Sequence, residues 1–240
     1  MRLYPAIDMI DGQCVRLVQG DYNQKSTFSE NPVEVALKWQ NLGGEFIHLV
    51  DLDGARKGNM PNFETIVNIA KTLDIPIEVG GGIRDMTAVE KYLENGINRV
   101  IIGTSAIRNP EFVKEAVEKY GDRIVVGIDA KDGMVAVSGW EEVSDVSALK
   151  LAKQMEKIGV KTIIYTDIAT DGMLSGPNVS AMKEMAEYTT MDVVASGGVT
   201  SLEDLKELSK TGVEGAIIGK ALYTGHIDLK EAIELTNTLK

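Results

Sequence analysis

Two aspartates, Asp8 and Asp129, are the residues of this sequence best suited to acid–base chemistry. Each closes an apolar run and precedes an Asp-Gly pair, in Ile7-Asp8-Met9-Ile10-Asp11-Gly12 and Ile128-Asp129-Ala130-Lys131-Asp132-Gly133. Two carboxylates that face each other across a pocket can act as base and acid if their environments differ. One such aspartate alone would more often only accept hydrogen bonds from its following loop. The repetition favours the catalytic interpretation.

Glycine-rich segments follow four of the apolar runs and predict two phosphate sites. Glycine lets the backbone approach phosphate oxygens closely, a threonine adds a hydroxyl and a lysine adds a positive charge. Tight turns between strands and helices need glycine anyway, so a single Gly-Gly pair is weak evidence. The candidate phosphate-binding residues are Gly81, Gly82, Gly103, Thr104, Gly176, Gly197, Gly198, Gly219 and Lys220. Sites on opposite sides of one pocket predict an elongated bisphosphate ligand.

Four further features each allow a functional and a structural interpretation. Trp140 is a candidate stacking platform for a planar base, or a packing tryptophan. The polar segment Gln19–Ser26 predicts a mobile lid, or an inert surface loop. His48 is expected to point inward near the end of its strand, although a lone histidine is more often a satisfied polar residue. Cys14 is expected to be a small buried residue rather than a nucleophile.

Eight short apolar runs must position these residues. Nearly continuous apolar runs are typical of parallel strands that helices cover. The predicted strands are Leu3–Asp8, Phe46–Asp51, Ile77–Gly80, Arg99–Ile102, Ile124–Asp129, Thr162–Thr166, Val193–Ser196 and Gly215–Ile218. Asp8 and Asp129 then end the first and fifth strands, which lie opposite each other in an eight-stranded barrel.

Helical segments alternate with these strands, and several have proline in the first turn or glycine just past the end. One of the clearest predicted helices begins at Asn31-Pro32. The others are Met86–Asn95, Pro110–Tyr120, Asp145–Ile158 and Ser201–Thr211. Thr200–Glu203 has the spacing of a capping box at the start of the last one. Eight strand–helix units in this length predict a single closed (β/α)8 TIM barrel. A doubly wound open sheet is the alternative.

The sequence also repeats itself at half its length. Gly43 and Gly159 lie 116 residues apart, and so do further pairs, namely Asp51 and Asp167, Pro61-Asn62 and Pro177-Asn178, Gly81-Gly82 and Gly197-Gly198, and Gly103 and Gly219. An even repeat favours the barrel over the doubly wound sheet. We therefore predict one domain over residues 1–240, made of half-barrels of roughly 1–120 and 121–240. The Asp-Gly pairs predict tight hairpin turns in both halves.

Composition narrows the function classes. The net charge of −11 argues against a nucleic-acid partner, which requires a basic surface. No apolar run approaches the length of a membrane span, and the N-terminus lacks the apolar region of a signal peptide. The single cysteine excludes an internal disulfide, and two histidines without a His/Cys cluster argue against a zinc site. We expect a cytoplasmic monomer that binds neither nucleic acid nor membrane.

Several motifs closely resemble those of a family of histidine biosynthesis, the isomerases of phosphoribosylformimino-aminoimidazole-carboxamide ribotide (ProFAR). They are Pro5-Ala6-Ile7-Asp8, Val15-Arg16-Leu17-Val18-Gln19-Gly20, His48-Leu49-Val50-Asp51-Leu52-Asp53-Gly54-Ala55, Gly80-Gly81-Gly82-Ile83-Arg84 and Ser196-Gly197-Gly198-Val199. The resemblance extends from Met1 to the last predicted strand. It implies a half-barrel duplication, a substrate with a phosphate at each end, and an aldose–ketose isomerisation of an aminosugar that uses no cofactor and no metal.

The resemblance also implies roles for individual residues. Asp129 would be the general acid that opens the ribose ring, and Asp8 the base that removes the proton from the adjacent carbon. Thr166 and Asp171 would support the acid. Four more residues would contact or clamp the substrate, namely Arg16, His48, Arg84 and Trp140.

Three alternatives stay open at this point. The cyclase subunit of imidazole-glycerol-phosphate synthase shares both aspartates and both phosphate sites, but its first strand usually contains Pro-Cys-Leu-Asp and it has a lysine where this chain has Arg16. A dual isomerase would also act on phosphoribosyl anthranilate. A catalytically silent phosphosugar-binding barrel would have little need for the two opposed carboxylates, Asp8 and Asp129.

Overall fold

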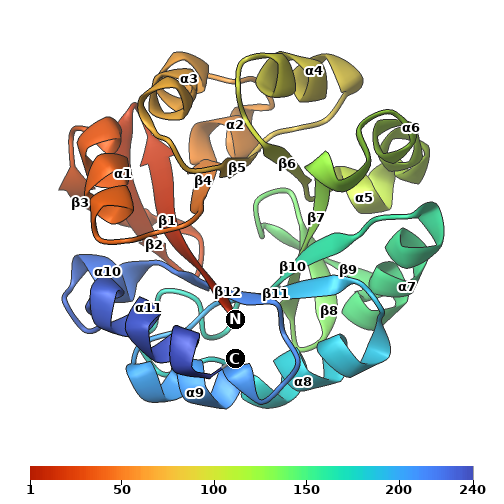
Figure 1. The fold of residues 1–240 in the computed structure, drawn as a ribbon. Helices are drawn as coiled ribbons and strands as arrows, with labels where there is room; N and C mark the ends of the chain where they lie inside the picture. Colours follow the sequence, from red (N-terminus) through yellow and green to blue (C-terminus); the bar gives the residue numbers. More distant parts are fainter. Residues whose placement is uncertain (240) are drawn as a thin grey trace.

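Eight parallel strands close into a barrel in the computed structural model, which describes residues 1–239 (Figure 1). These strands are β1 (Arg2–Ile10), β4 (Ile47–Asp51), β5 (Ile77–Gly80), β6 (Arg99–Ile102), β7 (Ile124–Lys131), β10 (Thr162–Asp167), β11 (Asp192–Ser196) and β12 (Gly215–Ile218). Each pairs in parallel with the next, and β12 pairs with β1 to close the sheet. Closure confirms the predicted (β/α)8 barrel and excludes the doubly wound sheet.

Helices surround this barrel as an outer ring in Figure 1. They are α1 (Pro32–Asn41), α2 (Leu52–Lys57), α3 (Phe63–Thr72), α4 (Met86–Glu94), α5 (Ser105–Arg108), α6 (Pro110–Tyr120), α7 (Ala148–Ile158), α8 (Val179–Tyr188), α9 (Leu202–Ser209), α10 (Lys220–Tyr223) and α11 (Leu229–Thr238), with a 3-10 turn at Gly121–Arg123. Proline occupies the first turn of α1 and α6, where its missing N–H costs nothing. The largest apolar cluster fills the space between the ring and the barrel.

Several helix ends differ from the sequence prediction, and α9, for example, ends at Ser209 rather than at Thr211. The helix predicted from Asp145 begins only at Ala148, because the Ser147 side chain caps it and Asp145 belongs to a strand. The capping box predicted over Thr200–Glu203 is wrong by one residue. Ser201 is the cap and Asp204 closes the box, accepting from the backbone N–H of Ser201 at 2.9 Å.

Antiparallel ribbons extend the first and fifth barrel strands. β1 continues into β2 (Gln13–Val18) and β3 (Asp21–Ser29), whereas β7 continues into β8 (Met134–Val137) and β9 (Glu142–Ser147). The Asp-Gly turns are confirmed, since Asp11 and Asp132 have φ of 49° and 51°. The segment Gln19–Ser26 is not an irregular loop, because most of it forms β3.

Side chains from both halves of the chain fill the barrel interior. This inner cluster contains Tyr4, Ala6, Phe46, Ile101, Val125, Ile164, Val194 and Ile217. At the end where the strands begin, the Arg99 guanidinium lies 4.5 Å from the centre of the Phe46 ring and 5.7 Å from that of Tyr4. We call Tyr4, Phe46 and Arg99 the barrel floor. The opposite end of the barrel stays open.

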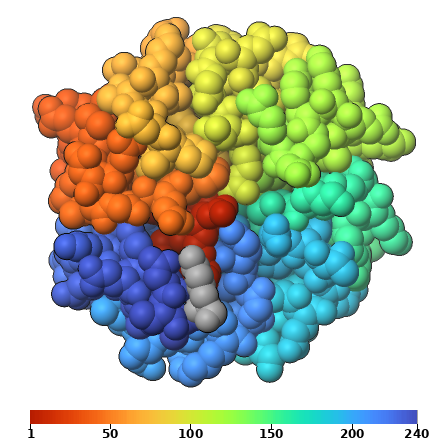
Figure 2. Space-filling view, in the orientation of Figure 1, coloured from red at the N-terminus to blue at the C-terminus, as the bar shows by residue number. Residues whose placement is uncertain are grey.

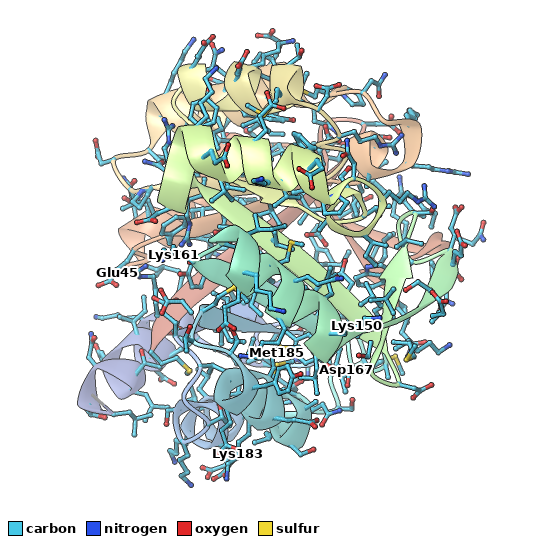
Figure 3. The ribbon with its side chains drawn as sticks, turned by 90° about the vertical axis from the view of Figure 1, so that its right-hand side faces the viewer. Glu45, Lys150, Lys161, Asp167, Lys183 and Met185 are labelled. Atoms are coloured by element: carbon cyan, nitrogen blue, oxygen red, sulfur yellow. The ribbon has the colours of Figure 1, made fainter. Side chains whose placement is uncertain are left out.

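The strands all run in one direction, which places their carboxyl ends on one face. In Figure 3, Lys161, just before β10, lies to the left and Asp167, the last residue of β10, lies to the right of it, while Glu45, just before β4, lies on the side of Lys161. The space-filling view from the side where the strands begin shows the first residues filling the centre of that face (Figure 2). Within residues 1–239, no helix has the length and apolar character to cross a membrane.

Candidate active site

A cavity of about 510 Å³ lies at the carboxyl ends of the strands, within the usual size of small-molecule sites. Sequence-predicted site residues from both halves line it: Asp8, Arg16, His48, Gly81, Gly82, Arg84, Gly103, Thr104, Asp129, Trp140, Thr166, Asp171, Gly197, Gly198, Gly219 and Lys220. Gly176 does not line the cavity. Its carbonyl oxygen instead packs against Gly198 so closely that a side chain on Gly198 would collide with it. The folded chain thus brings together residues that are spread over the whole sequence.

Asp8, near the end of β1, forms a buried ion pair. Arg16 Nη1 donates to Asp8 Oδ2 at 2.7 Å, and the two side chains are only 12% and 16% exposed. Arg16 also donates to the backbone carbonyl of Ala6, and its guanidinium lies 5.3 Å from the centre of the Tyr223 ring. The hairpin turn after β1 makes this possible, because it folds β2 back and aligns Val15 with Asp8.

Asp129, on β7, is held by hydrogen bonds from two other segments. Trp140 Nε1 donates to Asp129 Oδ2 at 2.8 Å, and the Thr166 hydroxyl bonds the same carboxylate from the adjacent position on β10. Burial raises the pKa of Asp129 against the opposing effects of these hydrogen bonds and of His48. A carboxyl with a raised pKa holds its proton longer and is better suited to act as an acid.

The indole of Trp140 lines the cavity rather than the apolar core. Its ring lies so close to Gly20 that a side chain there would collide with it, so the turn between β2 and β3 covers the ring. Trp140 and Ser138 have φ of 72° and 58°, a conformation that non-glycine residues rarely adopt. Such backbone strain is typical of functional loops.

Asp171 is the third aspartate of the cavity. Burial, together with the charges of Asp8 and Asp129, raises its pKa to about 6, although Arg16 and Lys220 act in the opposite direction. Like charges in one site favour a protonated form for at least one of them. Lys220 Nζ donates to the carbonyl of Gly172 at 2.9 Å, which holds the ammonium beside this group.

The glycine turns of the two halves are built in the same way. A side chain on Gly81 would collide with the carbonyl of Asp51, and a side chain on Gly197 would collide with that of Asp167. Asn62 Nδ2 donates to Asp51 Oδ1 at 2.7 Å, and Asn178 Nδ2 donates to Asp167 Oδ2 at 2.6 Å. The half-length repeat of the sequence therefore persists in the hydrogen bonds that shape both turns.

Cations differ between the two turns. Arg84, which donates to the carbonyl of Ala55 at 3.1 Å, and Arg108 line the cavity on the side of the first turn. Arg108 donates to Ser138 Oγ at 2.8 Å, and the N–H of Ser138 donates to the Thr104 hydroxyl at 3.0 Å.

Gly219 has a second role, because the guanidinium of Arg16 occupies the space that a side chain there would need.

Comparison with known proteins agrees with this geometry. Residues 2–228 match the model of a family described as "Histidine biosynthesis protein". The chain belongs to this family.

Curated members of the histidine biosynthesis family match over nearly their whole length. A relative from Ruminiclostridium cellulolyticum is 57% identical over 97% of this chain and 99% of its own. One from Thermoanaerobacter pseudethanolicus is 54% identical over 98% and 99%, and one from Listeria welshimeri is 51% identical over 99% of both chains. Each is named as an isomerase of a 1-(5-phosphoribosyl)imidazole-4-carboxamide that carries a second 5-phosphoribosylamino group on a methylideneamino link.

The sequence analysis did not single out Arg108 and Glu78, two charged residues at or beside the cavity. Arg108 lines the cavity from α5, and its only sequence signal is its position shortly after Gly103-Thr104. Glu78 is fully buried, and its Oε1 lies 2.9 Å from Nδ1 of His48. This contact depends on the fold and has no signal in the sequence. Cys14 is buried as expected, and burial raises the pKa of its thiol to about 12.

Proposed function

We propose that this protein is an isomerase of histidine biosynthesis that converts the aminoaldose ProFAR into its aminoketose isomer by an Amadori rearrangement. The observation that carries the proposal is the placement of Asp8 and Asp129 in one cavity between two equivalent glycine turns. The family and the names of the relatives support the reaction class.

The chemistry divides between the two aspartates. Asp129 gives its proton to the ring oxygen of the aminosugar, the bond from that oxygen to C1 breaks, and an imine forms between C1 and the nitrogen. Asp8 removes the proton from C2, which gives an enolamine. The enolamine tautomerises when its C2 hydroxyl becomes the carbonyl of the ketose and C1 gains a proton. Burial favours the protonated form of Asp129, and this suits the first step.

The two glycine turns position the sugar between Asp8 and Asp129. The substrate named for the relatives carries two phosphoribosyl groups, and the two turns offer one anion site each, with Arg84 and Arg108 near the first and Lys220 near the second. Binding energy from both ends of an elongated ligand fixes its reacting centre, and such positioning contributes several kcal/mol to catalysis, on the order of 7 or more in favourable cases.

The direct test is a steady-state assay of the purified chain with ProFAR, without metal, nucleotide or ammonia, and with identification of the product. Formation of the aminoketose supports the proposal. An unchanged substrate, together with consumption of the ketose after ammonia is added, would identify a cyclase and overturn it.

The proposal extends to a monomer in the cytoplasm that acts on small molecules, without nucleic acid or membrane. The acidic net charge of −11 and the single cysteine support it, and both halves of the site come from one chain. Light scattering coupled to size-exclusion chromatography should give the mass of one chain, 26.0 kDa. A mass of two chains would contradict the monomer.

A further inference from the structure

A buried carboxylate lies directly beneath the active site and has no part in the mechanism above. Glu78, on β5, has no solvent exposure. Burying an ionised carboxylate is costly unless other groups compensate its charge and fill its lone pairs. The partners of Glu78 therefore show what the residue is for.

Both carboxylate oxygens of Glu78 have a partner on an adjacent strand. Oε1 lies 2.9 Å from Nδ1 of His48 on β4, and Oε2 lies 2.8 Å from Nη2 of Arg99 on β6. The contact with Arg99 is an ion pair without the alignment of a hydrogen bond, since Oε2 accepts none. The strand register places these three residues side by side, because His48 pairs with Glu78 and Glu78 pairs with Arg99 across the parallel sheet.

The two partners face opposite ends of the barrel. Arg99 belongs to the floor, where its guanidinium lies over Phe46 and donates to the Tyr4 hydroxyl at 3.2 Å. His48 lines the cavity together with Asp8 and Asp129. Within residues 1–239 no side chain or backbone group hydrogen-bonds Nε2 of His48, so this nitrogen is left for a ligand.

We propose that Glu78 is a positioning residue that fixes the tautomer and the orientation of His48. A neutral imidazole carries one proton, and the partner of one ring nitrogen decides which nitrogen holds it. The carboxylate of Glu78, ion-paired with Arg99, can only accept, so Nδ1 must donate. Nε2 is then an acceptor that faces the cavity and takes a hydrogen bond from a hydroxyl of the sugar. This last step rests on the proposed function.

The tautomer can be measured without any substrate. The chain has two histidines, so nitrogen-15 NMR of labelled protein resolves each ring. At about pH 8, where an ordinary imidazole is neutral, His48 should show a protonated Nδ1 and an unprotonated Nε2. His226, which is exposed and lies 2.8 Å from the Thr224 hydroxyl, is the internal reference. The opposite tautomer, or a ring protonated at both nitrogens, overturns the proposal.

Three variants separate positioning from stability. Glu78→Gln keeps an acceptor for Nδ1, so the tautomer should persist and kcat/KM should stay within about threefold of the wild type. Glu78→Leu removes the acceptor, so the His48 signals should shift and kcat/KM should fall by about tenfold, the scale of one buried hydrogen bond. Arg99→Lys keeps the positive charge but loses the flat contact with Phe46. It should lower the Tm while it leaves the tautomer and kcat/KM unchanged.

The outcomes distinguish this proposal from the proposed function. If Glu78→Leu leaves the His48 signals and kcat/KM at wild-type values, Glu78 does not position His48. If Glu78→Leu does not fold, the tautomer of the wild-type protein still decides. A wild-type protein that shows the expected tautomer but does not isomerise ProFAR contradicts the proposed function and supports the positioning of His48.

Discussion

Three aspartates share the active-site cavity with cations that include Arg16 and Lys220, and the balance of these charges sets which group holds a proton. Arg16 pairs directly with Asp8, whereas Asp129 receives hydrogen bonds from Trp140 and Thr166. Different environments for like groups are the usual way in which one site supplies both an acid and a base. Asp171 carries a cost of this arrangement, because burial and the charges of Asp8 and Asp129 raise its pKa to about 6.

Asp171→Asn should stabilise the protein at high pH. Its folded-state pKa of about 6 lies above the ordinary value of 3.8, so the stability linked to this group is complete below about pH 4 and is lost as the pH rises through 6. The variant should therefore unfold at a higher Tm than the wild type at about pH 8, by an equivalent of about 1–2 kcal/mol after allowance for partial exposure. Thermal unfolding at several pH values checks this. A stabilisation that persists undiminished at about pH 4 would contradict the assignment.

The sequence predicts which aspartates line the cavity, but it does not predict all of the residues around them. Asp8 and Asp129 were predictable because each closes an apolar run and the repeat places them in equivalent positions, although β1 and β7 both continue two residues further than predicted. Glu78 and Arg108 were not, because their importance depends on strand register and on the path of α5. A sequence without an alignment does not show which side chains become neighbours across a sheet.

At the scale of elements, strand–helix units and turn glycines determine the fold, and polar segments are harder to interpret. The barrel strands are mostly apolar and are recognisable in the sequence, whereas β3 is mostly exposed and its sequence is typical of a loop. It forms because the turn at Gln19-Gly20 returns the chain onto β2, and pairing supplies the backbone hydrogen bonds. A hairpin strand made of exposed polar residues leaves only a weak signal in local composition.

Glu156 joins α7 to the turn before β11 and should contribute pH-dependent stability. It accepts from the Thr190 N–H at 2.6 Å and the Thr189 hydroxyl at 2.9 Å, and pairs with Lys153 at 2.7 Å. The hydrogen bond from Lys153 and those from the threonines lower the pKa of Glu156 to about 2. The stability linked to it is thus complete above its ordinary value of 4.5 and is lost as the pH falls towards 2.

Glu156→Gln should therefore lower the Tm at neutral pH, and the difference from the wild type should shrink as the solution is acidified below about pH 4.5. Glu187→Gln is the matched control. Glu187 lies on α8, 3.6 Å from Lys183, and both side chains are more than half exposed. The Tm of the Glu187→Gln variant should therefore equal that of the wild type. Equal effects of the two substitutions would show that the Glu156 contacts do not stabilise the fold.

At the scale of the whole molecule, the two half-barrels complete each other. The pairings of β6 with β7 and of β12 with β1 join them, and the inner cluster takes Phe46 and Ile101 from one half and Val125 and Ile164 from the other. A half alone would expose two strand edges and half of this cluster. The sequence indicates the repeat directly, but it leaves open whether the halves unfold together.

We expect the halves to unfold as one cooperative unit. The chain has one tryptophan in each half, Trp39 and Trp140, so Trp39→Phe and Trp140→Phe each leave a reporter in the other half. In urea, fluorescence of each variant and its far-ultraviolet circular dichroism should give coincident transitions. Separate midpoints for fluorescence and circular dichroism within one variant would mean that residues 1–240 form two folding units.

The central claim is that Asp8 and Asp129 perform the acid–base steps, and the most direct test is turnover of ProFAR by Asp8→Asn and Asp129→Asn. Each should lose at least about 100-fold in kcat, the usual scale for a general acid or base, with its fold intact by circular dichroism. Asp132→Asn is the control, since Asp132 is exposed in the hairpin turn after β7, where asparagine fits equally well. It should keep near-full activity. Near-full activity of either Asp8→Asn or Asp129→Asn would contradict the account.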